Sequence, residues 1–366
     1  MSLLFEPLQI GSLHLRNRLM RSATAERLSH PDTGAPLPAL AALYRALGEG
    51  GVGTIVTGHA FVEPAGKAHP EMSSLASDDL IPAWRQTIAA AQAAGAQVIV
   101  QINHSGASCD PDVNPDPVSP SGVATAERAR PRAMTGAEVE RAIEAFGRAA
   151  WRAQQAGFDG VQLHGAHGYL ITQFLTPATN SRSDRWGPGG PYGRLGFLRD
   201  VVDSVRRQVG DRYPVWIKLG VSGASQHGLT AADGARVAAF CREVGIACVE
   251  VSHALGQPEE VGRGEGRYLP LAEAARAAVG PGYPLALVNG LRSLRAMERI
   301  LAGGVVQLAS MCRPLIAEPD LPKRLASGAS RRAVCASCGN CWAEGPGLGT
   351  GCHNEKVREK LLDRTS

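Results

Sequence analysis

The 366-residue chain has no apolar run that approaches the roughly twenty residues needed to cross a bilayer, and its N-terminus lacks the features of an export signal. We therefore expect a cytoplasmic protein with no membrane partner. The chain also lacks a large net charge: the formal value is +4, and no block of lysine and arginine stands out. This excludes the charge pattern of a nucleic-acid-binding protein, although a small anionic ligand remains compatible with it.

Cysteines are absent from the first hundred residues, and half of the eight are bunched near the C-terminus. Cys109, Cys241, Cys248 and Cys312 are scattered, whereas Cys335, Cys338, Cys341 and Cys352 lie close together. In a chain without an export signal, such bunching indicates a metal or cluster site more than a disulfide framework.

Short aliphatic runs alternate with alanine- and arginine-rich helical patterns along most of the chain. Apolar runs that do not alternate with polar residues are typical of parallel strands covered on both faces. Eight such units in roughly 330 residues predict an α/β fold, a (β/α)₈ TIM barrel over 1–328 with a short cysteine-containing tail over 329–366. The expected strands are 17–23, 53–60, 97–103, 159–165, 214–220, 247–253, 284–290 and 305–311, and the expected helices 37–50, 80–95, 136–157, 193–210, 230–245 and 293–304.

Chemistry in such a barrel belongs to the C-terminal ends of the strands. The fourth expected strand ends in HGAHGYL, residues 164–170, whose two histidines could bind a metal, clamp a carbonyl oxygen or pack as structure. No carboxylate stands convincingly at another strand end to complete a metal site. After the last two strands, Asn289-Gly290 and Arg313 supply backbone donors and a charge, either for a phosphate or as an ordinary turn.

Residues 164–187, HGAHGYLITQFLTPATNSRSDRWG, closely resemble a segment of the old yellow enzyme-type flavoproteins. The similarity continues in order through LFEPLQIGSLHLRNRLMRSAT, GGVGTIVTGHAFV, VQINHSG and VNGLRS…ASMCRPLIAEPDL, so that it covers residues 3 to 325. It implies an FMN barrel that takes hydride from NADH or NADPH and passes it to the β-carbon of an activated alkene.

The resemblance also implies the residues of the site. Ser22, Ala23 and Thr24 would lie along the isoalloxazine with Ala60 beside it, Gln101 would bond its pyrimidine edge, and Lys218 would lie near flavin N1 and O2. Asn289, Gly290, Cys312 and Arg313 would hold the phosphate. His164 and His167 would bind the substrate carbonyl oxygen, where two donors stabilise growing enolate charge, and Tyr169 would protonate the α-carbon.

Four positions depart from the family pattern. Cys312 replaces a common glycine, although its backbone N–H can still donate to a phosphate, and Ala25 stands where many relatives carry Cys or Thr that bonds the flavin. Glu26 and Arg27 are charged where an aromatic residue often lines the substrate pocket. Both the flavin potential and the substrate are therefore left open.

The tail CASCGNCWAEGPGLGTGC has the spacing C-x2-C-x2-C-x10-C. Three thiolates within seven residues can converge on one ion, and a fourth can close the set. The spacing resembles the [4Fe–4S] segment of dienoyl-CoA reductase and trimethylamine dehydrogenase, but it is shorter in two gaps. A [4Fe–4S] cluster, a zinc site at Cys335, Cys338, Cys341 and Cys352, and free or paired thiols therefore remain three alternatives.

The resemblance predicts an FMN-dependent ene-reductase acting on a small enone- or enal-type α,β-unsaturated carbonyl compound, with NADH or NADPH as the electron donor. The alternative is an FMN dehydrogenase or C–N-cleaving enzyme that passes electrons through a C-terminal Fe–S cluster to a separate redox partner. We expect a homo-oligomer.

Overall fold

Eight parallel strands close into a barrel in the computed structural model, which describes residues 2–125, 130–224, 228–259, 261–342 and 349–363. β3 pairs with β13 on one side and with β4 on the other, which closes the sheet and confirms the predicted TIM barrel. Around the barrel the strands are β3 (Leu19–Arg21), β4 (Thr54–Phe61), β6 (Gln97–Asn103), β9 (Gly160–Gly165), β10 (Val215–Ser222), β11 (Cys248–His253), β12 (Leu285–Leu287) and β13 (Leu308–Met311).

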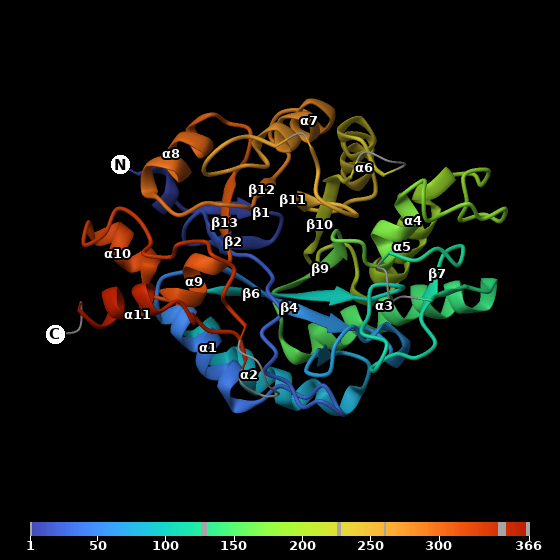
Figure 1. Ribbon diagram of the computed structural model, residues 1–366, viewed down its shortest axis with the longest axis horizontal. Helices are drawn as coiled ribbons and strands as arrows, with labels where there is room; N and C mark the ends of the chain where they lie inside the picture. The colour runs from blue at the N-terminus through green and yellow to red at the C-terminus, as the bar shows by residue number, and fades with distance from the viewer. Residues whose placement is uncertain (1, 126–129, 225–227, 260, 343–348, 364–366) are drawn as a thin grey trace.

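Helices surround the strands on the outside, as Figure 1 shows. Two of them begin with a capping box, Thr135 with Glu138 and Thr230 with Asp233, in which side chains satisfy backbone N–H groups that the first turn leaves free. The helices are α1 (Pro38–Glu49), α2 (Ile81–Ala93), α3 (Gly136–Ala156), α4 (Leu170–Leu175), α5 (Gly196–Val209), α6 (Ala231–Glu243), α7 (Leu269–Val279), α8 (Leu294–Ala302), α9 (Arg313–Ala317), α10 (Leu321–Ser327) and α11 (Glu355–Leu362). No described helix is long and apolar enough to cross a membrane.

A hairpin of β1 (Leu8–Ile10) and β2 (Leu13–Leu15) covers the N-terminal end of the barrel. Its apolar side chains pack against residues near the beginnings of the strands, including Met20, Trp216 and Leu308, all of them buried. This end of the barrel is therefore filled by apolar packing, and the opposite end is left for polar side chains.

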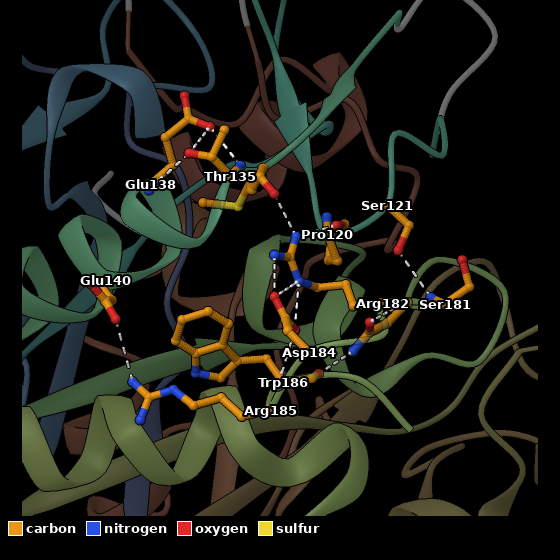
Figure 2. A network of polar contacts seen from close by, with 12 residues as sticks. Pro120, Ser121, Thr135, Glu138, Glu140, Ser181, Arg182, Asp184, Arg185 and Trp186 are labelled. Atoms are coloured by element: carbon orange, nitrogen blue, oxygen red, sulfur yellow. Dashed lines mark hydrogen bonds and ion pairs between the residues drawn. The ribbon is translucent and has the colours of Figure 1, made fainter. Parts of the chain in front are cut away.

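The loop that follows α4 contains the segment NSRSDRWG, residues 180–187, whose side chains bind it to neighbouring loops. Figure 2 shows the Arg182 guanidinium, which donates to the backbone carbonyls of Pro120 at 2.7 Å and Met134 at 2.6 Å and forms an ion pair with Asp184. The Arg185 guanidinium lies 4.5 Å above the ring of Trp186. These residues fasten the loop, so their part in the motif is structural.

Candidate active site

His164 ends β9, and Tyr169 directly precedes α4, so one short turn carries both side chains. His164 Nδ1 accepts a hydrogen bond from the Ala166 N–H at 3.3 Å, which leaves the ring proton on Nε2. The ring centroids of His164 and Tyr169 are 4.7 Å apart, and both residues line a cavity of about 250 Å³. The turn thus offers one N–H donor and one phenol to the same space.

His167 lies in this turn in a left-handed backbone conformation, with φ of 60°, which a non-glycine residue rarely adopts. Its backbone N–H donates to the His253 carbonyl at 3.0 Å, and its Nε2 lies 2.8 Å from the hydroxyl of Ser252. The two contacts from β11 hold the imidazole beside His164, with ring centroids 5.0 Å apart. Ser252 was not identified from the sequence.

A second histidine pair borders Tyr169 and was also not predicted. His59, on β4, has its ring centroid 5.1 Å from that of Tyr169, and its Nε2 lies 3.3 Å from His69 Nε2. On its other side, Nδ1 of His59 is 3.0 Å from the amide nitrogen of Asn103. His59 lines the cavity together with His164 and His167, and His69 lies behind it.

Burial sets the protonation of these groups. Burial is the main reason that the pKa of His59 is lowered to about 3 and that of His69 to about 4. The positive charge of Lys218 lowers the pKa of His59 further. Burial likewise places the pKa values of His164 and His167 well below the usual range, and it raises the pKa of Tyr169 to about 12. Near neutral pH the imidazoles are therefore uncharged and the phenol keeps its proton.

A cavity of about 390 Å³ adjoins the first one, and the two share Ala23, His167 and Cys312 in their walls. The side chains expected around a flavin are gathered here, with the exception of Ala60, which is fully buried and lines neither cavity. Ser22, Ala23, Lys218, Asn289, Gly290, Cys312 and Arg313 line the larger cavity, and Thr24 and Gln101 line the smaller one.

A buried carboxylate lies beside Lys218 on the neighbouring strand. Glu250, which is 0% exposed, accepts hydrogen bonds from Ser22 at 2.7 Å and Ser310 at 2.8 Å, and it also accepts one from Gln162 at 3.0 Å. Gln162 in turn accepts from the side-chain amide of Gln101 at 2.8 Å. Glu250 was missed, although a lone charged residue within the apolar run ACVEVSH was a usable signal.

Glu26 does not reach the substrate cavity, contrary to the expectation from its position in the sequence. It is buried between strands, where it forms an ion pair with Arg21 at 2.7 Å and accepts a hydrogen bond from the hydroxyl of Tyr44 at 2.9 Å. The side chain therefore joins β3 to β4 and α1, while the adjacent Ala25 stays in the cavity wall.

The C-terminal tail reaches this cavity through Trp342, which lines it together with Tyr169 and His164. The indole N–H donates to the Ala25 carbonyl at 3.1 Å, and the hydroxyl of Thr350 donates to the same oxygen at 2.8 Å. Because Trp342 and Thr350 also form a β-bridge, the tail is fixed over the end of β3.

The expected metal site at Cys335, Cys338, Cys341 and Cys352 is not supported. Within the part of the chain that the structure describes, no group of three or more His, Cys, Asp or Glu side chains is placed to hold a metal ion, and all four thiols are free. Their surroundings differ: Cys338 is exposed, whereas burial raises the pKa of Cys335 and raises that of Cys341 to about 11. The thiols do not fit a common ion in this arrangement.

The chain is similar to several known proteins. A family model described as NADH:flavin oxidoreductase / NADH oxidase matches residues 3–332. The chain is 33% identical over 338 residues to a metal reductase of Desulforamulus reducens, covering 90% of this chain and 49% of that protein. It is 30% identical over 324 residues to an NADPH dehydrogenase of Geobacillus sp. (strain WCH70), and this match covers 88% of this chain and 93% of that protein.

The solved structure of a 2-naphthoyl-CoA reductase in complex with 2-naphthoyl-CoA superposes with a TM-score of 0.89 at 26% identity, covering 98% of this chain and 58% of that one. The chain thus spans about half the length of the curated relatives it matches first.

Proposed function

The chain belongs to the NADH:flavin oxidoreductase / NADH oxidase family, and we propose that it is an FMN-dependent ene-reductase that uses NADH or NADPH to reduce the activated C=C bond of an α,β-unsaturated carbonyl compound. The observation that carries the proposal is the common cavity of His164, His167 and Tyr169 beside the larger, cation-lined cavity. The relative that was solved with an aryl thioester supports the carbonyl class of substrate.

The residues present fit FMN by the chemistry of their donors. The Arg313 guanidinium and the backbone N–H of Cys312 would hold the phosphate together with the turn at Asn289-Gly290. Lys218 and the amide of Gln101 lie deeper, where they would face the polar edge of the ring. When bound, FMN supplies the hydride acceptor and donor.

Side chains of the protein would stabilise the negative charge on the substrate oxygen and supply the proton for the α-carbon. As hydride reaches the β-carbon, negative charge grows on the carbonyl oxygen, and the His164 Nε2–H and the His167 ring would donate hydrogen bonds to it. Tyr169 would then give its proton to the α-carbon and regain one from water. A phenol with a pKa of about 12 is a weak acid in solution, but it suffices for a carbanion-like carbon held beside it.

Trp342 would close the outer side of the substrate cavity. Because its indole N–H donates to the Ala25 carbonyl, Trp342 would present a flat apolar wall to a bound substrate. Such a wall favours planar, conjugated substrates over saturated or bulky ones.

Anaerobic stopped-flow spectroscopy tests the proposal in two halves. NADH or NADPH should bleach the flavin, and cyclohexenone should restore its colour. Tyr169→Phe should slow the second step by about 10²- to 10⁴-fold and leave the first unchanged. An unchanged second step removes the proton-donor role of Tyr169. Bleaching by neither nucleotide would favour the alternative, a dehydrogenase or C–N-cleaving enzyme whose own substrate reduces the flavin and whose electrons leave to a partner.

A further inference from the structure

A third cavity, of about 650 Å³, adjoins the outer end of the proposed flavin cavity and is rich in arginine. The two share Arg267, Asn289, Gly290, Arg313 and Ser337 in their walls, so they meet where the flavin phosphate would be held. The rest of the third cavity extends beyond this border, over the beginning of α8 and the segment before α7.

The described residues around it do not balance its positive charge. Glu265 is the one carboxylate among the described lining residues, and it is already engaged: it accepts from the N–H groups of Arg292 and Ser293 at 2.8 Å each and pairs with Arg332 at 3.3 Å. The guanidinium of Arg292 donates to the Cys335 carbonyl at 3.1 Å, while its buried Nε has no partner in the described chain.

Four further arginines are left without a partner. Arg263, Arg267, Arg295 and Arg299 line the cavity and form no ion pair or side-chain hydrogen bond within the described ranges. Arg295 and Arg299 are four residues apart on α8, so their side chains lie on one face of the helix. Several like charges around one space repel each other and create a strong field for an anion.

One flavin phosphate does not account for this set. The border residues Arg313 and Arg267, with the backbone donors beside them, are sufficient for a single dianion, and the α8 arginines lie on the far side of that border. Guanidinium groups bind phosphate oxygens through paired hydrogen bonds and keep their charge at every physiological pH. The cavity therefore has the donors for a second phosphorylated group.

We propose that this arginine-lined cavity binds the phosphate groups of the nicotinamide nucleotide, and so favours NADPH, which carries one phosphate more than NADH. The identity of the nucleotide rests on the proposed function; the phosphate chemistry of the cavity does not. With the flavin phosphate at the shared border, the nicotinamide would lie in the substrate cavity beside the flavin ring, and the phosphates would extend outward into the arginine-lined cavity.

The test compares the FMN-loaded protein with the double variant Arg295→Gln/Arg299→Gln. Arg45→Gln serves as the matched control, because Arg45 is an exposed arginine on another helix, α1. Calorimetric titration with inorganic pyrophosphate needs no turnover. We expect the double variant to weaken its binding by about tenfold or more, and high salt to weaken it in the wild type.

In the reductive half-reaction, the double variant should raise the Kd for NADPH by about tenfold. An equal rise for NADH assigns the cavity to the shared diphosphate, and no rise for NADH assigns it to the extra phosphate of NADPH; both results support the site. Unchanged pyrophosphate binding overturns it, and so does loss of FMN from the double variant, because the arginines would then serve the flavin. If pyrophosphate binds as expected but neither nucleotide reduces the flavin, the proposed function fails and the phosphate site stands.

Discussion

Lys218 Nζ lies 3.5 Å from Glu250 Oε2, at the same level of the neighbouring strands β10 and β11, and both side chains are almost completely buried. The hydroxyl of Ser22 joins them, because it accepts from Lys218 at 2.8 Å and donates to Glu250 at 2.7 Å. The barrel thus holds a cation beside the proposed flavin site and supplies its counter-charge from the neighbouring strand.

Replacing Glu250 by Gln should destabilise the protein by about 3 to 5 kcal/mol, because the substitution leaves a buried ammonium group without its counter-charge. Urea unfolding measures the change. The double variant Glu250→Gln/Lys218→Met should recover much of the loss, since it removes both charges together. A single variant as stable as the wild type would show that the pair is not coupled.

Gly58→Ala should destabilise the protein by about 1 to 3 kcal/mol or more. A Cβ at this position would lie within 1.9 Å of Glu26 Oε2 and 2.5 Å of the Thr24 carbonyl oxygen, and so it would push the buried carboxylate away from Arg21. Gly189→Ala is the matched control, because its Cβ would meet nothing within 4 Å, and its effect should stay within about 0.5 kcal/mol. Thermal unfolding of the two variants under the same conditions measures this difference in stability, and equal stabilities would contradict the prediction.

Acid should unfold the protein partly through its buried histidines. His59 and His69 titrate near 6.5 in the unfolded chain, but burial lowers their folded pKa values to about 3 and about 4. Below pH 6.5 these two histidines are therefore protonated in the unfolded state but remain neutral in the folded state. The contribution of each histidine to the free energy of unfolding is fully present above pH 6.5. It falls by about 1.4 kcal/mol per pH unit as the pH drops toward the pKa of that histidine in the folded state.

Urea unfolding between pH 7 and pH 4 measures this dependence. His59→Gln should reduce the slope of stability against pH, and His14→Gln, at an exposed position of the N-terminal hairpin, should leave it as in the wild type. An identical slope in His59→Gln would mean that His59 accepts a proton in the folded state.

All eight barrel strands could be predicted from the sequence because each is an apolar run bounded by glycine or polar residues and followed by a helix. α7 was missed, although LPLAEAARAAV is helical in composition, and the tail helix α11 was missed because its polar sequence gives almost no apolar periodicity. Polar helices of this kind are defined by their caps more than by a buried face.

The sequence predicted the site residues that lie together in one local motif, and it did not predict those that come from separate strands. His164, His167 and Tyr169 belong to one turn, so a local pattern contains them all. His59, Ser252 and Glu250 come from other strands and become neighbours only when the barrel closes. The Arg-rich cavity was missed for the same reason, since its arginines are spread over four separate segments.

Ser252 should determine how well His167 serves as a donor. With the Ser252 hydroxyl donating to Nε2, the ring proton resides on Nδ1, the nitrogen left for a ligand. Ser252→Ala should therefore lower kcat/KM for cyclohexenone by about tenfold, while reduction of the flavin by nucleotide stays unchanged. Ser252→Thr keeps the hydroxyl and should restore most of the activity, because only the hydrogen bond is required. If Ala and Thr variants lose activity equally, the site needs the small size of serine and not its hydroxyl; if neither loses activity, His167 is oriented by its backbone bond to His253 alone.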